Sequence, residues 1–240
     1  LGVDRERIAV VRNGADEIPV SVPEGDESTR TAHPSLTVLS RLVPHKQIED
    51  ALDVVAALRG RIPDIHLDVI GGGWWEQNLR DYVGELGIEQ YVTFHGHVDE
   101  DRKHALLGRS WVHIMPSRKE GWGLAVVEAA QHGVPTVGYR SSKGLTDSII
   151  DGVTGVLVGG LSDGEEDRDV SGLTAAVSEL LQDAEARTRL GEKARVRAAE
   201  FSWEQCAEGV YSVLDATTRG SWSSGLVGAQ HSDSAQQSYR

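Results

Sequence analysis

The sequence predicts an α/β fold built on a doubly wound, mostly parallel, Rossmann-like sheet. Short apolar runs typical of buried strands alternate along the chain with segments of helical spacing, and glycine or proline follows most of them. The composition, 39% hydrophobic and 25% charged over 240 residues, is that of a globular protein. Strands that alternate with helices favour parallel pairing, because each parallel strand needs a crossover connection.

In the first half of the chain, the expected strands are short, aliphatic and β-branched. They cover residues 7–12, 36–42, 65–70 and 91–94. The helix over residues 48–58 is the clearest, because its apolar residues recur three and four positions apart and Gly60 follows it. Two more helices are expected over residues 79–86, which Gly87 ends, and over residues 100–107.

The second half continues the alternation and then becomes helical. Strands are expected over residues 111–115, 135–139 and 155–158, with a helix over residues 124–132 that stops at Gly133. Three helices follow, over residues 173–181, 184–200 and 203–217. Ser202 with Gln205 three positions later is typical of a capping box at the start of the last helix.

We expect one domain over residues 1–218 and a disordered tail over residues 219–240, which is rich in Ser, Gly and Gln. The net charge of -13 argues against nucleic acid as a partner, because nucleic-acid binding needs a basic face. The single cysteine, Cys206, cannot form an internal disulfide, which favours a reducing, cytoplasmic location. No apolar stretch approaches a span of about 18 residues, so we expect no transmembrane segment.

The stretch from Glu120 to Glu128 is the most informative in the chain. It joins an expected strand to an expected helix, where the first helical turn has backbone N–H groups that attract anions. Gly121 and Gly123 carry no side chains, so a ligand can approach the backbone closely. Two carboxylates beside an anion cradle suit a ligand with phosphate in the middle and hydroxyls at both ends. Solvated surface glutamates of the same spacing are the alternative.

Arg41 and Lys46 stand at the end of the expected strand over residues 36–42, just before a helix. The guanidinium fork of arginine matches a phosphate group, and lysine offers a compact positive charge. Five positions apart across a turn, the two side chains could close on one diphosphate. On the residues alone, exposed charges at the start of a helix are the simpler interpretation.

These motifs resemble those of the retaining GT-B glycosyltransferases, which include glycogen-synthase-like and mannosyltransferase-like enzymes. The stretch from Glu120 to Glu128 is similar to their Glu-x7-Glu motif, and Ser40-Arg41-Leu42 with Lys46 is similar to their diphosphate-binding motif. The resemblance covers roughly residues 1–218 and implies the donor-binding, C-terminal half of that fold. It implies catalytic roles for Arg41, Lys46 and Glu120. The residues it implies for donor binding are Gly72, Val98, Gly121, Gly123, Leu124, Ala125 and Glu128.

Two further elements resemble the family pattern less closely. Asn13-Gly14-Ala15-Asp16 resembles the Asn-Gly-x-Asp element that follows the first linker, which implies that an N-terminal acceptor domain precedes this chain in the intact enzyme. Lys143-Gly144 and Asp147 stand where the family has Gly-Gly-x-x-Glu. Because of this departure, a turn or cap role for Asp147 is as good an interpretation as a donor contact.

The resemblance implies transfer of a hexose from a nucleoside diphosphate sugar to a hydroxyl acceptor, with retention. The donor would be a UDP or GDP sugar, and neither a cofactor nor a catalytic metal is implied. His95 and His97 have no third ligand at a familiar metal-site spacing. A non-catalytic nucleotide-sugar-binding module and a GT-B sugar-nucleotide epimerase stay open as alternatives. Peripheral membrane contact by the intact enzyme stays open too.

Overall fold

The computed structural model describes residues 8–19, 29–160 and 168–219. The chain divides into two compact units, one of Glu17–Ala198 and the other of Leu1–Asp16 together with Ala199–Arg240. The tail expected over residues 219–240 lies outside the described residues, apart from Arg219. None of the helices in the described ranges has the length and apolar character that a membrane crossing requires.

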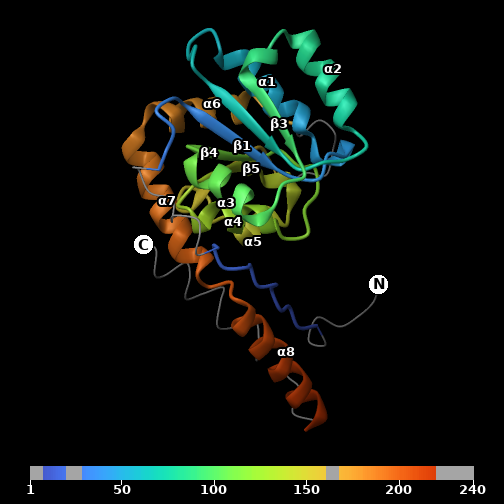
Figure 1. The fold of residues 1–240 in the computed structure, drawn as a ribbon. Helices are drawn as coiled ribbons and strands as arrows, with labels where there is room; N and C mark the ends of the chain where they lie inside the picture. The colour runs from blue at the N-terminus through green and yellow to red at the C-terminus, as the bar shows by residue number, and fades with distance from the viewer. Residues whose placement is uncertain (1–7, 20–28, 161–167, 220–240) are drawn as a thin grey trace. The chain divides into compact units, whose positions relative to one another are not determined.

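The larger unit, Glu17–Ala198, is built on a six-stranded sheet in the order β3-β2-β1-β4-β5-β6 (Figure 1). All neighbouring strands are parallel, so the predicted doubly wound parallel sheet is confirmed. The strand order reverses after β3, and the chain returns to place β4 beside β1. The strands are β1 (Ser35–Leu39), β2 (His66–Ile70), β3 (Val92–Gly96), β4 (Val112–Met115), β5 (Thr136–Tyr139) and β6 (Gly155–Val158).

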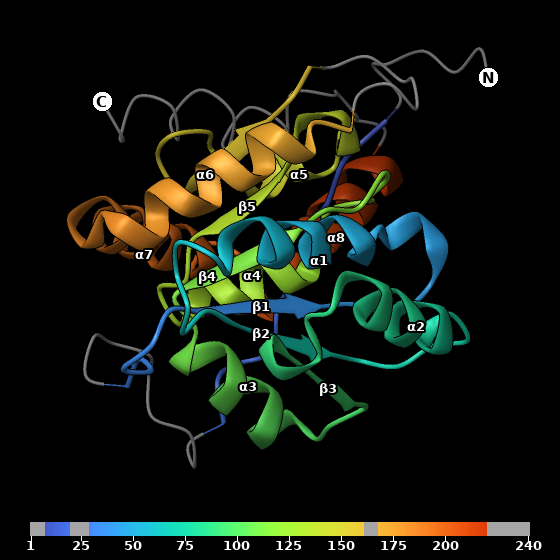
Figure 2. The same ribbon diagram turned by 90° about the horizontal axis from the view of Figure 1, so that it is seen from above.

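Helices cover both faces of this sheet (Figures 1 and 2). On one face α1 (Ile48–Leu58) packs against α2 (Glu76–Leu86) and α6 (Val170–Gln182). On the other, α4 (Leu124–Gln131) packs against α3 (Glu100–Arg109) and α7 (Ala184–Ala198). The sequence did not indicate the short helix α5 (Leu145–Ser148) or the 3-10 turns at Pro44–Lys46, Glu89–Tyr91 and Arg140–Ser142.

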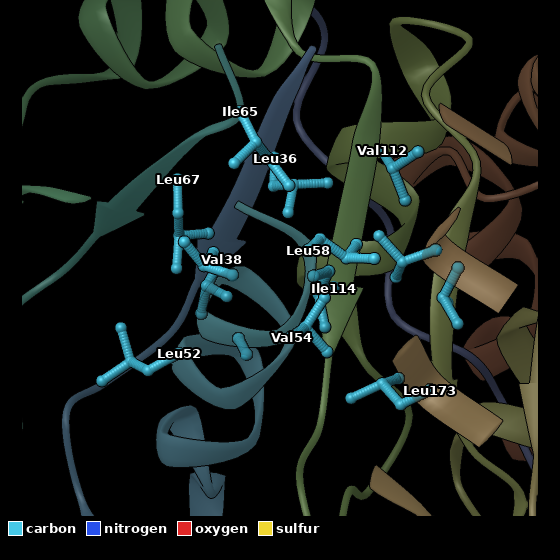
Figure 3. Close-up of a cluster of buried hydrophobic side chains, with 14 of the residues drawn as sticks. Leu36, Val38, Leu52, Val54, Leu58, Ile65, Leu67, Val112, Ile114 and Leu173 are labelled. Carbon is cyan, nitrogen blue, oxygen red and sulfur yellow. The ribbon is translucent and has the colours of Figure 1, made fainter. Parts of the chain in front are cut away.

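The two faces of the sheet bury different kinds of side chain. Alternate strand residues form one apolar core with α1 and α6; it includes Leu36, Val38, Leu52, Val54, Leu58, Ile65, Leu67, Val112, Ile114 and Leu173 (Figure 3). The opposite face buries polar residues, among them Thr37, Asp68, His113 and Thr136. His113 Nδ1 lies 3.0 Å from Thr136 Oγ1, and burial lowers the pKa of His113 to about 3. A neutral, hydrogen-bonded histidine is the form that tolerates this burial.

Most predicted elements of the larger unit are present, with shifts at their ends. The helix predicted over residues 48–58 has the same bounds as α1, and Gly87 ends α2 in the left-handed region at φ 59. The first strand is shorter than predicted, because β1 ends at Leu39 and not at Leu42. Beyond Leu39 the backbone follows the glycine turn after β2, with Leu42 N donating to Gly72 O at 3.0 Å.

The smaller unit contains α8 (Trp203–Thr218) and residues that pack at its start. Ser202 Oγ accepts a bond from Gln205 N at 3.2 Å, which is the serine half of the predicted capping box. Trp203 Nε1 donates to Asp16 Oδ1 at 2.7 Å, and a Cβ on Gly14 would lie 2.6 Å from Trp203 N. The strand predicted over residues 7–12 is wrong for residues 8–12, where the structure assigns no strand.

Candidate functional site

The loops that follow β1 and β4 meet where the strand order reverses. Because the strands are parallel, their carboxyl ends share one edge of the sheet, and in doubly wound sheets ligands bind at such a reversal of strand order. Lys46 Nζ donates to Glu120 Oε1 at 2.5 Å, and Arg118 N donates to His45 O at 3.0 Å. The structure therefore joins two of the three predicted catalytic residues.

Lys46 and Glu120 form a mostly buried ion pair. Their side chains are 14% and 10% exposed, so each charge has lost most of its water and depends on the other. Arg41 lies on the same loop as Lys46, but its side chain is exposed and has no partner among the described residues. Arg41, the third predicted catalytic residue, is thus close to the pair in sequence but does not contact it.

The loop after β4 leads into the N-terminus of α4. Gly123 caps this helix at φ 85, a conformation that favours glycine, and a Cβ there would lie 2.9 Å from Leu145 Cδ2 and displace that side chain. Gly121 differs, because a Cβ there would meet nothing within 4 Å. Of the two glycines expected to admit a ligand, only Gly121 borders open space. Leu124 is exposed and Ala125 half-buried, in the first turn where backbone N–H groups point outward.

Glu128, one turn into α4, contacts a cation that sequence analysis missed. Lys103 Nζ donates to Glu128 Oε1 at 2.6 Å and also pairs with Glu100 Oε2 at 2.6 Å. Burial lowers the pKa of Lys103, but its bonds to Glu100 and Glu128 outweigh burial and raise it overall. The i,i+3 spacing of Glu100 and Lys103 was visible in the sequence. The contact with Glu128 arises from the packing of α3 against α4, which no local pattern indicates.

Gly72 and Val98 lie in the loops after β2 and β3. A Cβ on Gly72 would lie 4.0 Å from His97 N, so these two loops run close together. A Cβ on Gly73 would lie 2.1 Å from Leu42 O, which ties the glycine turn to the Arg41–Lys46 loop. Gly73 therefore serves close backbone packing, as the predicted tight turn requires, whereas Gly72 has room for a Cβ.

The two histidines beside this turn have separate surroundings. His95 Nε2 lies 2.6 Å from Asp68 Oδ1, and His97 is exposed. Across the part of the chain that the structure describes, no three His, Cys, Asp or Glu residues come together as a metal site.

A strained turn supports the backbone of Glu120. Lys143 has φ 58 and ψ -62, and Gly144 N donates to Ser142 O at 2.7 Å, which is a γ-turn of positive φ. Glu120 N donates to the same Ser142 O at 3.3 Å. A Cβ on Gly144 would lie 2.4 Å from Glu120 O. The departure from the Gly-Gly-x-x-Glu pattern thus places a lysine where the backbone favours glycine, while Asp147 lies exposed within α5.

An open hollow of about 500 Å³ lies at the other edge of the sheet. It is lined by His33, Pro63, Asp64, Ile65, His66, Gln90 and Tyr91, around the residues where β2 and β3 begin. In open parallel sheets ligands bind at the carboxyl ends of the strands. We therefore take the Lys46–Glu120 edge, and not this hollow, as the candidate site.

Comparison with known proteins gives related sequences. The family model described as glycosyl transferases group 1 matches residues 26–197. A glycogen synthase of Mycobacterium tuberculosis (strain CDC 1551 / Oshkosh) is 33% identical over 221 residues, covering 92% of this chain and 51% of that protein. A GDP-mannose-dependent alpha-(1-6)-phosphatidylinositol monomannoside mannosyltransferase of Mycolicibacterium smegmatis is 30% identical over 210 residues, covering 85% and 51%. The chain spans about half the length of these relatives.

Solved structures share the fold. TarM of S. aureus, in complex with fondaparinux, alpha-GlcNAc-glycerol and UDP, superposes with a TM-score of 0.74 at 20% identity, over 88% of this chain and 40% of that one. The pneumococcal O-GlcNAc transferase GtfA, in complex with UDP and GlcNAc, gives 0.72 at 23% identity, over 85% and 38%. The predicted Rossmann-like half of a GT-B fold is confirmed, and the chain belongs to the group 1 glycosyltransferase family.

Proposed function

We propose that this chain is the donor-binding half of a retaining glycosyltransferase that transfers a hexose from a nucleoside diphosphate sugar to a hydroxyl acceptor. The observation that carries the proposal is the Lys46–Glu120 contact at the strand reversal, beside the start of α4. It gathers a cation, a carboxylate and outward backbone N–H groups at one edge of the sheet. The cation and the N–H groups suit phosphate oxygens, and the carboxylate suits sugar hydroxyls.

Lys46 and Arg41 hold the diphosphate in this proposal. Lys46 exchanges Glu120 for phosphate when the donor binds, and the exposed Arg41 closes on the same phosphates. Negative charge grows on the diphosphate as it leaves, so the two cations and the helix N-terminus at Gly123–Ala125 stabilise the transition state. Glu120, released from Lys46, accepts hydrogen bonds from the sugar hydroxyls.

The nucleoside occupies the neighbouring loops. Glu128 accepts hydrogen bonds from the ribose, while Gly72 and Val98 border the base. Gly121 has no side chain and leaves room for the sugar donor to contact the backbone. UDP or GDP is the nucleotide we favour. The relative named as GDP-mannose-dependent and the structures of TarM and GtfA with UDP support that choice.

The remaining chemistry belongs to the intact enzyme. We assign the acceptor pocket to an N-terminal half outside this chain, because the chain spans only about half of its relatives. Retention proceeds by front-face attack, in which the leaving phosphate takes the acceptor proton. A reducing, cytoplasmic location suits a chain whose one cysteine, Cys206, is unpaired.

Calorimetry on four alanine variants tests the assignment. Arg41→Ala and Lys46→Ala should each weaken UDP or GDP binding by roughly 1.5–3 kcal/mol, the contribution of a charged hydrogen bond. Glu128→Ala should weaken nucleoside monophosphate binding too, because its partner is the ribose. Glu120→Ala should not weaken diphosphate binding, because it frees Lys46, and it should weaken sugar-donor binding. Arg61→Ala, an exposed arginine after α1, is the control and should bind like the parent.

Activity assays separate the alternatives. Transfer to an added acceptor by the chain joined to its N-terminal half supports the glycosyltransferase, and interconversion of sugar isomers without acceptor would identify an epimerase. Binding without either activity would identify a non-catalytic module. If all four variants bind every nucleotide like the parent, the site is not at Lys46–Glu120. Efficient transfer by this chain alone would contradict the assignment of the acceptor pocket to another half.

A further inference from the structure

Lys103 lies between two carboxylates that come from different helices. Its ammonium is 2.6 Å from Glu128 Oε1 on α4 and 2.6 Å from Glu100 Oε2 on its own helix, α3. Helices α3 and α4 pack side by side on one face of the sheet (Figure 1). Lys103 therefore links Glu128 on α4, which follows β4, to α3, which follows β3.

The two contacts differ in burial, and this difference assigns their roles. The Lys103 and Glu128 side chains are 13% and 14% exposed, whereas Glu100 is 59% exposed. Water screens the outer pair, and the inner pair is sheltered from it. The ammonium stays protonated at neutral pH, because the two bonds raise its pKa in spite of burial. Glu128 thus keeps a permanent cation at one of its oxygens.

A carboxylate that accepts bonds from two ribose hydroxyls must be held in one orientation. A glutamate side chain has several rotatable bonds, and fixing them on binding costs affinity. An ion pair formed before the ligand arrives removes that cost. We propose that Lys103 is a positioning residue for nucleoside recognition, which holds the Glu128 carboxylate toward the ribose hydroxyls. This inference rests on the proposed function, because it takes the ribose as the partner of Glu128.

The test compares ribose with a ribose that lacks the hydroxyls. Calorimetry uses UDP or GDP, whichever the parent binds, and its 2′,3′-dideoxy form. Lys103→Met should weaken binding of the ribonucleotide about tenfold, the size of one lost charged hydrogen bond. It should leave binding of the dideoxy form unchanged. Lys103→Arg should restore most of the ribonucleotide affinity, because a guanidinium also pairs with a carboxylate.

Arg102→Met is the matched control, since Arg102 is the neighbouring exposed cation on the same helix. It should bind both nucleotides like the parent. If Lys103→Met does not fold, Lys103→Gln, which keeps a donor and removes the charge, takes its place.

The outcomes separate this inference from the proposed function. A parent that binds no nucleoside diphosphate would refute the proposed function, and this inference with it. A parent that prefers the ribonucleotide, with a Lys103→Met variant that shows the same preference, would refute the positioning role alone. Equal weakening of both nucleotides would show that Lys103 supports the fold and not the ribose contact.

Discussion

The Lys46–Glu120 pair should show strong energetic coupling in the ligand-free protein. The perturbation is Lys46→Met, Glu120→Gln and the double variant. At 2.5 Å, two unit charges attract by about 1.7 kcal/mol in water and by about 6.6 kcal/mol at an effective dielectric constant of 20. Loss of hydration offsets much of that attraction, because only 14% and 10% of the two side chains are exposed.

The net coupling should lie at about 1–3 kcal/mol, between the values for surface pairs and for fully buried pairs. Each single variant leaves a sheltered group without its partner and should lower the free energy of unfolding by about 2 kcal/mol. The double variant should lose less than the sum of the two. Urea unfolding of the four proteins at pH 7 measures the coupling.

The exposed pair of Arg80 with Glu76, at 2.8 Å on α2, is the control cycle and should couple by about 0.3–0.5 kcal/mol. A coupling below about 0.5 kcal/mol for Lys46 and Glu120 would mean that the two charges act independently. In that case donor binding would not need to separate them, and the exchange that we propose for Lys46 would lose its basis.

Two further predictions concern pH and the turn beside Glu120. Between pH 6.5 and about 3, unfolded His113 binds a proton that the native residue does not. This residue should therefore lower the free energy of unfolding by about 1.4 kcal/mol for each unit by which the pH decreases. Urea unfolding of His113→Asn should show a shallower slope, and an unchanged slope would contradict the buried neutral state. Gly144→Ala should lower Tm, because its Cβ would lie 2.4 Å from Glu120 O, whereas Lys143→Gly should stabilise by about 1 kcal/mol by relieving the positive φ. A Tm for Lys143→Gly below that of the parent would show that the turn is not strained.

Sequence patterns predicted the larger unit well where the pattern and the packing agree. Residues 48–58 and 155–158 have the predicted bounds, and a glycine follows each closely, Gly60 after the helix and Gly159 after the strand. The strand predicted over residues 7–12 shows the limit. Its apolar run fits a strand, but a strand needs a neighbour, and local pattern does not show whether one exists. In the structure Val11 lies beside Gly209 of α8, whose added Cβ would be 3.0 Å from it.

For the candidate site, the sequence indicated individual residues but not the contacts between them. Spacing and resemblance indicated Lys46 and Glu120, and neither could show that they meet, because their contact depends on β4 returning beside β1. Lys103 was missed for the same reason. Its bond to Glu128 comes from helix packing, and one lysine in a charged helix has no distinguishing pattern.

The pairing of β1 with β4, which joins the two halves of the sheet, is short. β1 and β4 pair through Leu36↔Val112 and Thr37↔His113, whereas β1 pairs with β2 along the whole of Ser35–Leu39. A donor held by the loops after β1 and β4 would contact both halves of the sheet. Under the proposed function, its binding free energy would also stabilise the association of the β3-β2-β1 half with the β4-β5-β6 half. A bound donor would thus reinforce the β1–β4 pairing, which is the shortest between neighbouring strands of this sheet.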